Sequence, residues 1–225
     1  MKLHYKGFMK EKIHRNPMTI SPHATFFAAQ NLIQEKGIRH LPVVDRDGSV
    51  VGIVTDADIR KAAPSGATSL SVRELNYLLT KLKVSAFMTP KDKLITITTE
   101  TLLEEAVGLM HDHKIGCLPV MEGDKLYGIF TETDAMEFLV DIFGMKQKGT
   151  RLTIAVEDRP GSLLGVLEIF NRHDINIISI VCASFLVDGK RLSTFRIQTE
   201  DYEDVVRDIE KAGYCVASIG KWASD

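Results

Sequence analysis

The sequence has only three cysteines, Cys117, Cys182 and Cys215, which lie far apart along the chain. An odd number of cysteines at these spacings does not suit a disulfide framework or a zinc site. The pattern therefore predicts reduced thiols in a cytoplasmic protein, with no bound metal.

An excess of charge of one sign is also missing. The chain has 28 Lys and Arg against 30 Asp and Glu, and a formal net charge of −2. This balance does not indicate a basic surface for nucleic acid or for a membrane. The longest apolar run, residues 175–187, is too short to span a bilayer and contains Asn176 and Ser179. The N-terminus has basic residues but no apolar stretch, so no signal peptide is expected.

Short catalytic motifs are absent from the sequence as well. It contains no Gly-x-Ser-x-Gly, no His-Glu-x-x-His and no Walker phosphate loop. His111 and His113 would point to different faces of a helix, and His173 lies at a predicted helix end, where capping explains it. An enzyme is therefore the least favoured of three classes. The other two are a ligand-sensing regulator and a structural or oligomerisation module without a ligand.

What the sequence does have is a long internal repeat over its first two-thirds. A repeat of this length implies two similar folded units that meet face to face, and not a solenoid of short repeats. The matching segments are GIRHLPVV at 37–44 with KIGCLPVM at 114–121, GIVT at 52–55 and Asp58 with GIFT at 128–131 and Asp134, and Thr19-Ile20 with Thr96-Ile97.

Each copy predicts the same order of elements: a short strand, a helix, a β-hairpin and a second helix. Asp47-Gly48 and Gly123-Asp124 are typical of hairpin turns. Thr55 and Thr131 stand at the N-cap position of the second helix in each copy. The expected ranges are helices over 24–36, 72–82 and 102–113, and strands over 41–44, 50–54, 118–121 and 126–130.

The last third of the chain has no counterpart in the repeat. Residues 144–149 are expected to form a short linker, and the remainder predicts the order βαββαβ, which is that of a ferredoxin-like sandwich. The expected strands are 151–156, 175–187, 191–197 and 214–219, with helices over 162–172 and 202–211.

The repeat resembles a tandem pair of cystathionine-β-synthase (CBS) domains, a Bateman module, through GIRHLPVV with GIVTDADI and KIGCLPVM with GIFTETDA. The resemblance implies clefts that bind an adenine nucleotide, AMP, ADP or ATP, as a regulatory ligand. The resemblance also implies that the family's Thr-x-x-Asp element contacts the ribose and the phosphate of the nucleotide. A helix N-terminus also attracts anions, and a carboxylate accepts from both ribose hydroxyls. In the alternative interpretation, Thr55, Asp58, Thr131 and Asp134 only cap their helices.

The two clefts are not expected to be equivalent. Arg39, His40 and Arg60 of the first copy offer phosphate contacts, whereas the second copy has Gly116 and Cys117 in place of Arg39 and His40. The alternatives are a solvated surface pair for the arginines and a buried core histidine for His40. The candidate nucleotide-binding residues are Thr19, Arg39, His40, Thr55, Asp58, Arg60, Thr96, Cys117, Thr131 and Asp134.

The last unit resembles an ACT domain through DRPGSL at 158–163 and NRHDINI at 171–177. The resemblance implies a small effector, often an amino acid, at the loop after the first strand. Gly161 would let such a ligand approach the backbone, and the following helix N-terminus could hold a carboxylate. In the alternative, Pro160-Gly161 only shapes the turn and Asn176 only satisfies a strand edge. The candidate effector residues are Asp158, Arg159, Gly161, Ser162, Leu163, Asn176 and Ile177.

Two CBS units followed by one ACT unit resemble the bacterial acetoin-utilisation accessory protein family. The expected class is α/β (α+β), a Bateman module followed by a ferredoxin-like βαββαβ unit. The implied function is non-catalytic, allosteric sensing of small molecules in a homodimer or a dimer of dimers, and the regulated protein is not indicated. The expected divisions are repeat 1 at 8–62, a loop and helix at 63–83, repeat 2 at 84–143, a linker at 144–149 and an ACT-like domain at 150–222.

Overall fold

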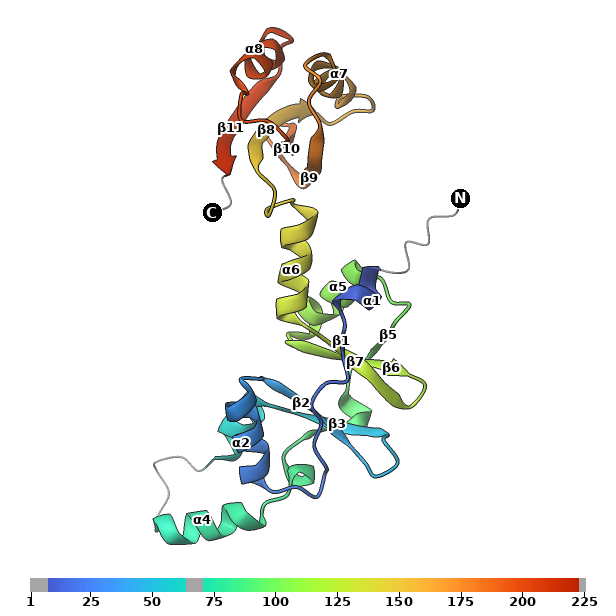
Figure 1. Ribbon diagram of the computed structural model, residues 1–225, viewed down its shortest axis with the longest axis vertical. Coiled ribbons are helices and arrows are strands. Elements are labelled where there is room, and N and C mark those ends of the chain that lie inside the picture. The colour runs from blue at the N-terminus through green and yellow to red at the C-terminus, as the bar shows by residue number, and fades with distance from the viewer. Residues whose placement is uncertain (1–7, 64–70, 223–225) are drawn as a thin grey trace. The chain divides into compact units, whose positions relative to one another are not determined.

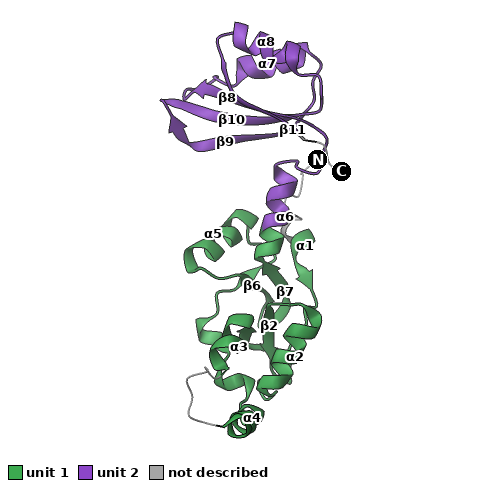
Figure 2. Cartoon of the chain, turned by 90° about the vertical axis from the view of Figure 1, so that its left-hand side faces the viewer, with its two compact units in different colours: residues 1–135 green, residues 136–225 purple. Residues whose placement is uncertain are grey.

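The computed structural model describes residues 8–63 and 71–222 (Figure 1). The chain divides into two compact units, residues 1–135 and 136–225 (Figure 2). The division falls within helix α6 (Glu132–Ile142), a few residues before the linker that the sequence suggests. The loop expected at 64–69 lies outside the described residues. No helix in the described ranges is long and apolar enough to cross a membrane.

The first repeat consists of a helix, a hairpin and a second helix around an apolar core. Thr25 caps the first helix by accepting from the Ala28 N–H at 3.2 Å, which is why this helix begins at residue 26 and not at 24. Gly37 ends it in the left-handed conformation. The elements are α2 (Phe26–Lys36), β2 (His40–Val44), β3 (Val50–Thr55) and α3 (Asp56–Ala62).

The second repeat has the same order of elements. Between the repeats lies α4 (Val72–Lys81), which begins at a capping box between Ser71 and Glu74. The elements of the second repeat are β5 (Ile97–Thr98), α5 (Leu103–His113), β6 (Cys117–Glu122), β7 (Lys125–Thr131) and α6.

The two repeats exchange their leading strands. β1 (His14–Arg15) precedes the first repeat but pairs with β7 of the second, placing His14 opposite Ile129. β4 (Thr89–Pro90) precedes the second repeat but pairs with β3 of the first, placing Thr89 opposite Ile53. Each repeat therefore completes the sheet of the other, and the two form one compact unit.

The second unit has the predicted βαββαβ order, so the expected fold class is confirmed. Its antiparallel sheet has the strand order β11-β8-β10-β9, and α7 and α8 cover one face (Figure 2). The strand expected from residue 175 begins at 177, because Ile175 donates to the Phe170 carbonyl at the end of the helix. The elements are β8 (Gly149–Glu157), α7 (Leu164–Arg172), β9 (Ile177–Val187), β10 (Lys190–Ile197), α8 (Glu203–Lys211) and β11 (Cys215–Trp222).

Candidate functional site

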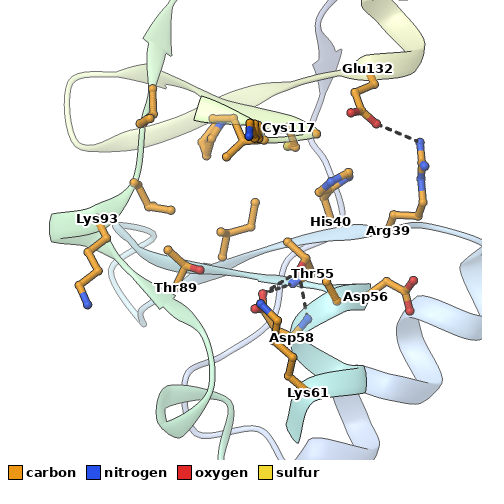
Figure 3. A pocket seen from close by; sticks show the side chains of 18 of the residues that line it. Arg39, His40, Thr55, Asp56, Asp58, Lys61, Thr89, Lys93, Cys117 and Glu132 are labelled. Carbon is orange, nitrogen blue, oxygen red and sulfur yellow. Dashed lines mark hydrogen bonds and ion pairs between the residues drawn. The ribbon is translucent and has the colours of Figure 1, made fainter. Parts of the chain in front are cut away.

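A cleft of about 410 Å³ lies beside the N-terminus of α3, and we name it the first cleft (Figure 3). Both repeats contribute to it, since Cys117 and Glu132 of the second repeat face α3 of the first. The candidate nucleotide residues that line it are Arg39, His40, Thr55, Asp58, Arg60 and Cys117.

A capping box fixes Asp58 at the edge of the first cleft. Its backbone N–H donates to the Thr55 hydroxyl at 3.2 Å, and its carboxylate Oδ2 accepts from the Thr55 N–H at 2.9 Å and hydroxyl at 2.7 Å. Both side-chain bonds use Oδ2, and no residue of the described ranges donates a hydrogen bond to Oδ1. Asp58 therefore caps α3 with one oxygen and holds a second acceptor oxygen for another donor.

Several cations stand around the first cleft. Arg39 reaches the Glu132 carboxylate at 4.0 Å, and Arg60 forms an ion pair with Asp56. Lys61, Lys93 and Lys114 line the same cleft. Lys93 and Lys114 were not among the predicted site residues: Lys93 lies outside the repeated motif, and Lys114 is the first residue of KIGCLPVM, opposite Gly37 of the first copy, which carries no charge.

Burial lowers the pKa of His40, and the neighbouring Arg39 guanidinium lowers it further. Glu132 and Asp56 oppose this shift. The ring is therefore uncharged near neutral pH, where one nitrogen can donate and the other can accept a hydrogen bond.

The remaining wall of the first cleft is largely apolar. It includes Ile53 and Pro119 from the two hairpins and Ile95 from the segment before β5. Cys117 is buried in this wall, and burial, followed by the charge of Asp134, raises its pKa to about 12. The thiol therefore stays protonated and does not act as a nucleophile at neutral pH.

A second cleft, of about 440 Å³, lies beside the motif of the second repeat. Thr131 lines it, together with His14 and Met18 from the N-terminal segment. Arg39 and His40 line both clefts. The two clefts therefore share one guanidinium and one imidazole.

Asp134 is held differently from its counterpart Asp58. The residue is 4% exposed and does not line the second cleft. Oδ2 accepts from the Thr131 N–H and hydroxyl, both at 2.7 Å, while Oδ1 lies 2.8 Å from His14 Nε2. Both carboxylate oxygens are thus engaged, and a ribose at Asp134 would have to replace His14.

Two further candidates, Thr19 and Thr96, are exposed and do not line either cleft. Both precede the helix of their repeat, as the motif suggested, and their chain neighbours Met18 and Ile95 line the second and the first cleft. Their role in nucleotide binding stays a prediction. No group of three or more metal-ligating side chains occurs in the part of the chain that the structure describes.

Replacing Asp134 by alanine is expected to lower the free energy of unfolding of the first unit by about 2–3 kcal/mol, because the partly buried Thr131 donors and His14 lose their acceptor. Asp58→Ala removes the equivalent cap at a more exposed site and should cost about 1 kcal/mol. Urea unfolding of the two variants beside the wild type measures both. Equal losses, or a larger loss for Asp58→Ala, would show that His14 and burial add nothing at Asp134.

The candidate effector residues of the second unit make contacts with their neighbours. Asp158 accepts from Arg191 Nη2 at 2.7 Å, Arg159 pairs with Glu157, and the Asn176 amide donates to Gln198 Oε1 at 2.9 Å. Gly161 has a φ of +82°, as a tight turn requires. These contacts are sufficient to explain the conformation of the loop as a turn. Effector binding at the loop stays a prediction. Ser162, Leu163 and Ile177 are partly buried.

Comparison with known proteins identifies two kinds of domain. The model of the CBS domain matches residues 10–65 and 84–141, and the model of the ACT domain matches residues 150–213. A CBS domain-containing protein of Dictyostelium discoideum is 31% identical over 138 residues, which are 61% of this chain and 94% of that protein.

Two further similarities fall largely on the repeat. Inosine-5'-monophosphate dehydrogenase of Pasteurella multocida is 33% identical over 120 residues, and the match spans 53% of this chain but only 22% of the enzyme. A crystal structure from Vibrio cholerae, named for acetoin utilization, is 27% identical with a TM-score of 0.50. That alignment covers 61% of this chain and 93% of the other.

Proposed function

Because the chain belongs to the CBS domain family and carries an ACT domain after the pair, we propose that it is a non-catalytic regulatory protein that binds an adenine nucleotide. The observation that carries the proposal is the first cleft, where the second oxygen of Asp58 and the N-terminus of α3 stand among cations. Such a helix end attracts an anion, and a carboxylate recognises ribose hydroxyls.

The residues of the first cleft suggest which part of a nucleotide each of them would contact. The aliphatic wall of Ile53, Ile95 and Pro119 suits a purine base. Asp58 would accept from the ribose hydroxyls, and the phosphates would meet Arg39 and the lysines. The same contacts serve AMP, ADP and ATP, so the proposal covers the adenine nucleotides as a class and leaves the phosphate number to experiment.

Calorimetric titration with AMP, ADP, ATP and S-adenosylmethionine tests the proposal. At least one adenine nucleotide is expected to bind saturably, to raise the apparent stability by about 2.7 kcal/mol at a hundred times its Kd, and to be recovered unchanged. Absence of binding by all four would favour the alternative of a structural or oligomerisation module. Conversion of the nucleotide would favour an enzyme.

Nucleotide affinity should rise as the pH falls below about 6.5. A bound phosphate places negative charge near His40, whose pKa is lowered in the free protein by burial and by Arg39. That charge favours the imidazolium, so binding takes up a proton and strengthens where His40 can be protonated. The gain is lost again as the pH rises through the pKa of the bound state.

The phosphate of AMP itself titrates near pH ~6, so the prediction concerns the difference between wild type and His40→Gln. Titrations with AMP at about pH 5.5 and 7.5, on either side of the unperturbed histidine value, measure that difference. The wild type is expected to gain more affinity on acidification than the variant. Identical pH dependence in the two proteins would remove His40 from the phosphate site.

The proposed assembly is a homodimer formed through the ACT sheet, or a dimer of dimers if the CBS units also associate. β9 is an edge strand and carries exposed apolar side chains, which are Ile180, Phe185, Leu186 and Val187. A long apolar edge of this kind favours pairing with a second copy.

Analytical ultracentrifugation at micromolar concentration is expected to give a dimer for the wild type and more monomer for Phe185→Lys. A wild-type monomer of 25.1 kDa would contradict the proposal.

A further inference from the structure

A cavity of about 330 Å³ lies on the face of the ACT sheet opposite α7 and α8. It belongs entirely to the second unit. Its lining residues come from β8, β9, β10 and the segment after α6, and they are Phe143, Met145, Arg151, Ser179, Val181, Thr194 and Arg196.

Strand register brings the polar lining residues together. Arg151 of β8 lies opposite Arg196 of β10, and Arg196 in turn lies opposite Ser179 of β9. Thr194, two residues before Arg196, therefore shares its face of the sheet and lies opposite Val181. The helix-facing side of the same strands carries the buried core, including Leu152 and Phe195.

The two arginines are held in place by neighbouring oxygens. Arg196 is 5% exposed and donates from Nε to the Phe143 carbonyl at 2.8 Å, just beyond the C-terminus of α6. Arg151 donates from Nη1 to the Ser218 hydroxyl at 3.2 Å. Fixed guanidinium groups lose little rotamer freedom when they bind an anion.

The cavity has a positive and an apolar part. Burial lowers the pKa of Arg196, and the nearby positive charge of Arg151 lowers it further. None of the described side chains that line the cavity is acidic, while Phe143, Met145 and Val181 supply apolar surface. An anion would be attracted to the arginines, and an aliphatic tail would fit the remaining wall.

We infer that this cavity is a binding site for a small aliphatic monocarboxylate, with its carboxylate on Arg151 and Arg196 and its tail against Val181 and Met145. The site shares no residue with the candidate effector loop, since it uses neither residues 158–163 nor Asn176 and Ile177. None of its lining residues lines the first cleft, so hexanoate binding can be tested without the proposed nucleotide.

Titration of the full chain with hexanoate, in the absence of nucleotide, tests this site. The wild type is expected to bind hexanoate with a Kd below about 10 mM. Hexanamide has the same shape without the charge and should bind at least about tenfold more weakly, since it loses charge-assisted hydrogen bonds. Absence of saturable hexanoate binding, or equal affinity for the amide, overturns the inference.

Two substitutions test whether hexanoate binds on this face of the sheet. Arg151→Gln is preferred because Arg151 is half-buried, whereas Arg196 is nearly buried and its loss could unfold the sheet. Val181→Phe fills the cavity without changing charge. Each should weaken hexanoate binding by at least about tenfold. Arg207→Gln, at an exposed position on α8, is the matched control and should bind as the wild type does.

The outcomes separate this site from the other two. Loss of hexanoate binding in both sheet-face variants, with retention in Asn176→Ala and Arg207→Gln, supports the inference whether or not AMP binds to the wild type. Loss in Asn176→Ala with retention in Arg151→Gln and Val181→Phe would place the ligand at the loop and overturn it. If one sheet-face variant fails to fold, the other decides the outcome.

Discussion

Replacing Phe170 by alanine is expected to lower the free energy of unfolding of the second unit by about 3–5 kcal/mol. Phe170 is 1% exposed and packs edge-to-face against Phe195, with 5.2 Å between ring centroids. It lies in a core with Leu152 and Ile209, so the substitution leaves a cavity that these side chains cannot fill.

The first unit has a separate core, which includes Phe26, Leu41 and Val54. We therefore expect Phe170→Ala to leave AMP binding near the wild-type value while the second unit unfolds at lower urea concentration. Leu164→Ala, on the same helix but at a residue that is 59% exposed, is the control and should have little effect. Loss of AMP binding in parallel with unfolding of the second unit would show that the two units do not fold independently.

Replacing Asp58 by alanine should weaken nucleotide binding in the first cleft by about 1–3 kcal/mol, or about 5- to 150-fold. The substitution removes the second carboxylate oxygen, which we assign to the ribose hydroxyls, together with the cap on α3. Asp58→Asn separates these effects, since its amide oxygen can still cap the helix but its nitrogen cannot accept from a hydroxyl.

Calorimetric titration of the three proteins with the same nucleotide measures the effect. Both variants are expected to lose affinity, and Asp58→Asn should retain more of the stability. Asp47→Ala removes a carboxylate from the hairpin turn of the same repeat, outside the cleft, and serves as the charge control. Wild-type affinity in Asp58→Asn would show that Asp58 only caps the helix.

Local features of the fold could be predicted from the sequence because local chemistry determines them. The Asp47-Gly48 and Gly123-Asp124 turns are part of the predicted hairpins, and Thr55 caps α3 as its position suggested. The ACT unit followed from the order of its elements and from DRPGSL. Helix and strand starts differ from the predicted ones by two residues where Thr25 caps α2 and where Ile175 donates to the Phe170 carbonyl before β9.

Features that depend on distant residues could not be predicted. Nothing near Asp134 in the sequence indicates that His14 pairs with it. The two residues meet because β1, which contains His14, pairs with β7 of the second repeat in the strand exchange. The sharing of Arg39 and His40 between two clefts also depends on residues far apart in the sequence, since both clefts are lined from both repeats. The cavity on the ACT sheet likewise depends on strand register, which placed Arg151 opposite Arg196 without any local motif.

A crystal structure of the chain grown with saturating AMP tests the proposed nucleotide site directly. AMP is expected to occupy the first cleft, with a ribose hydroxyl within hydrogen-bond distance of Asp58 and the phosphate beside Arg39 or the lysines. An empty first cleft, or AMP bound there with its ribose away from Asp58, would contradict this expectation.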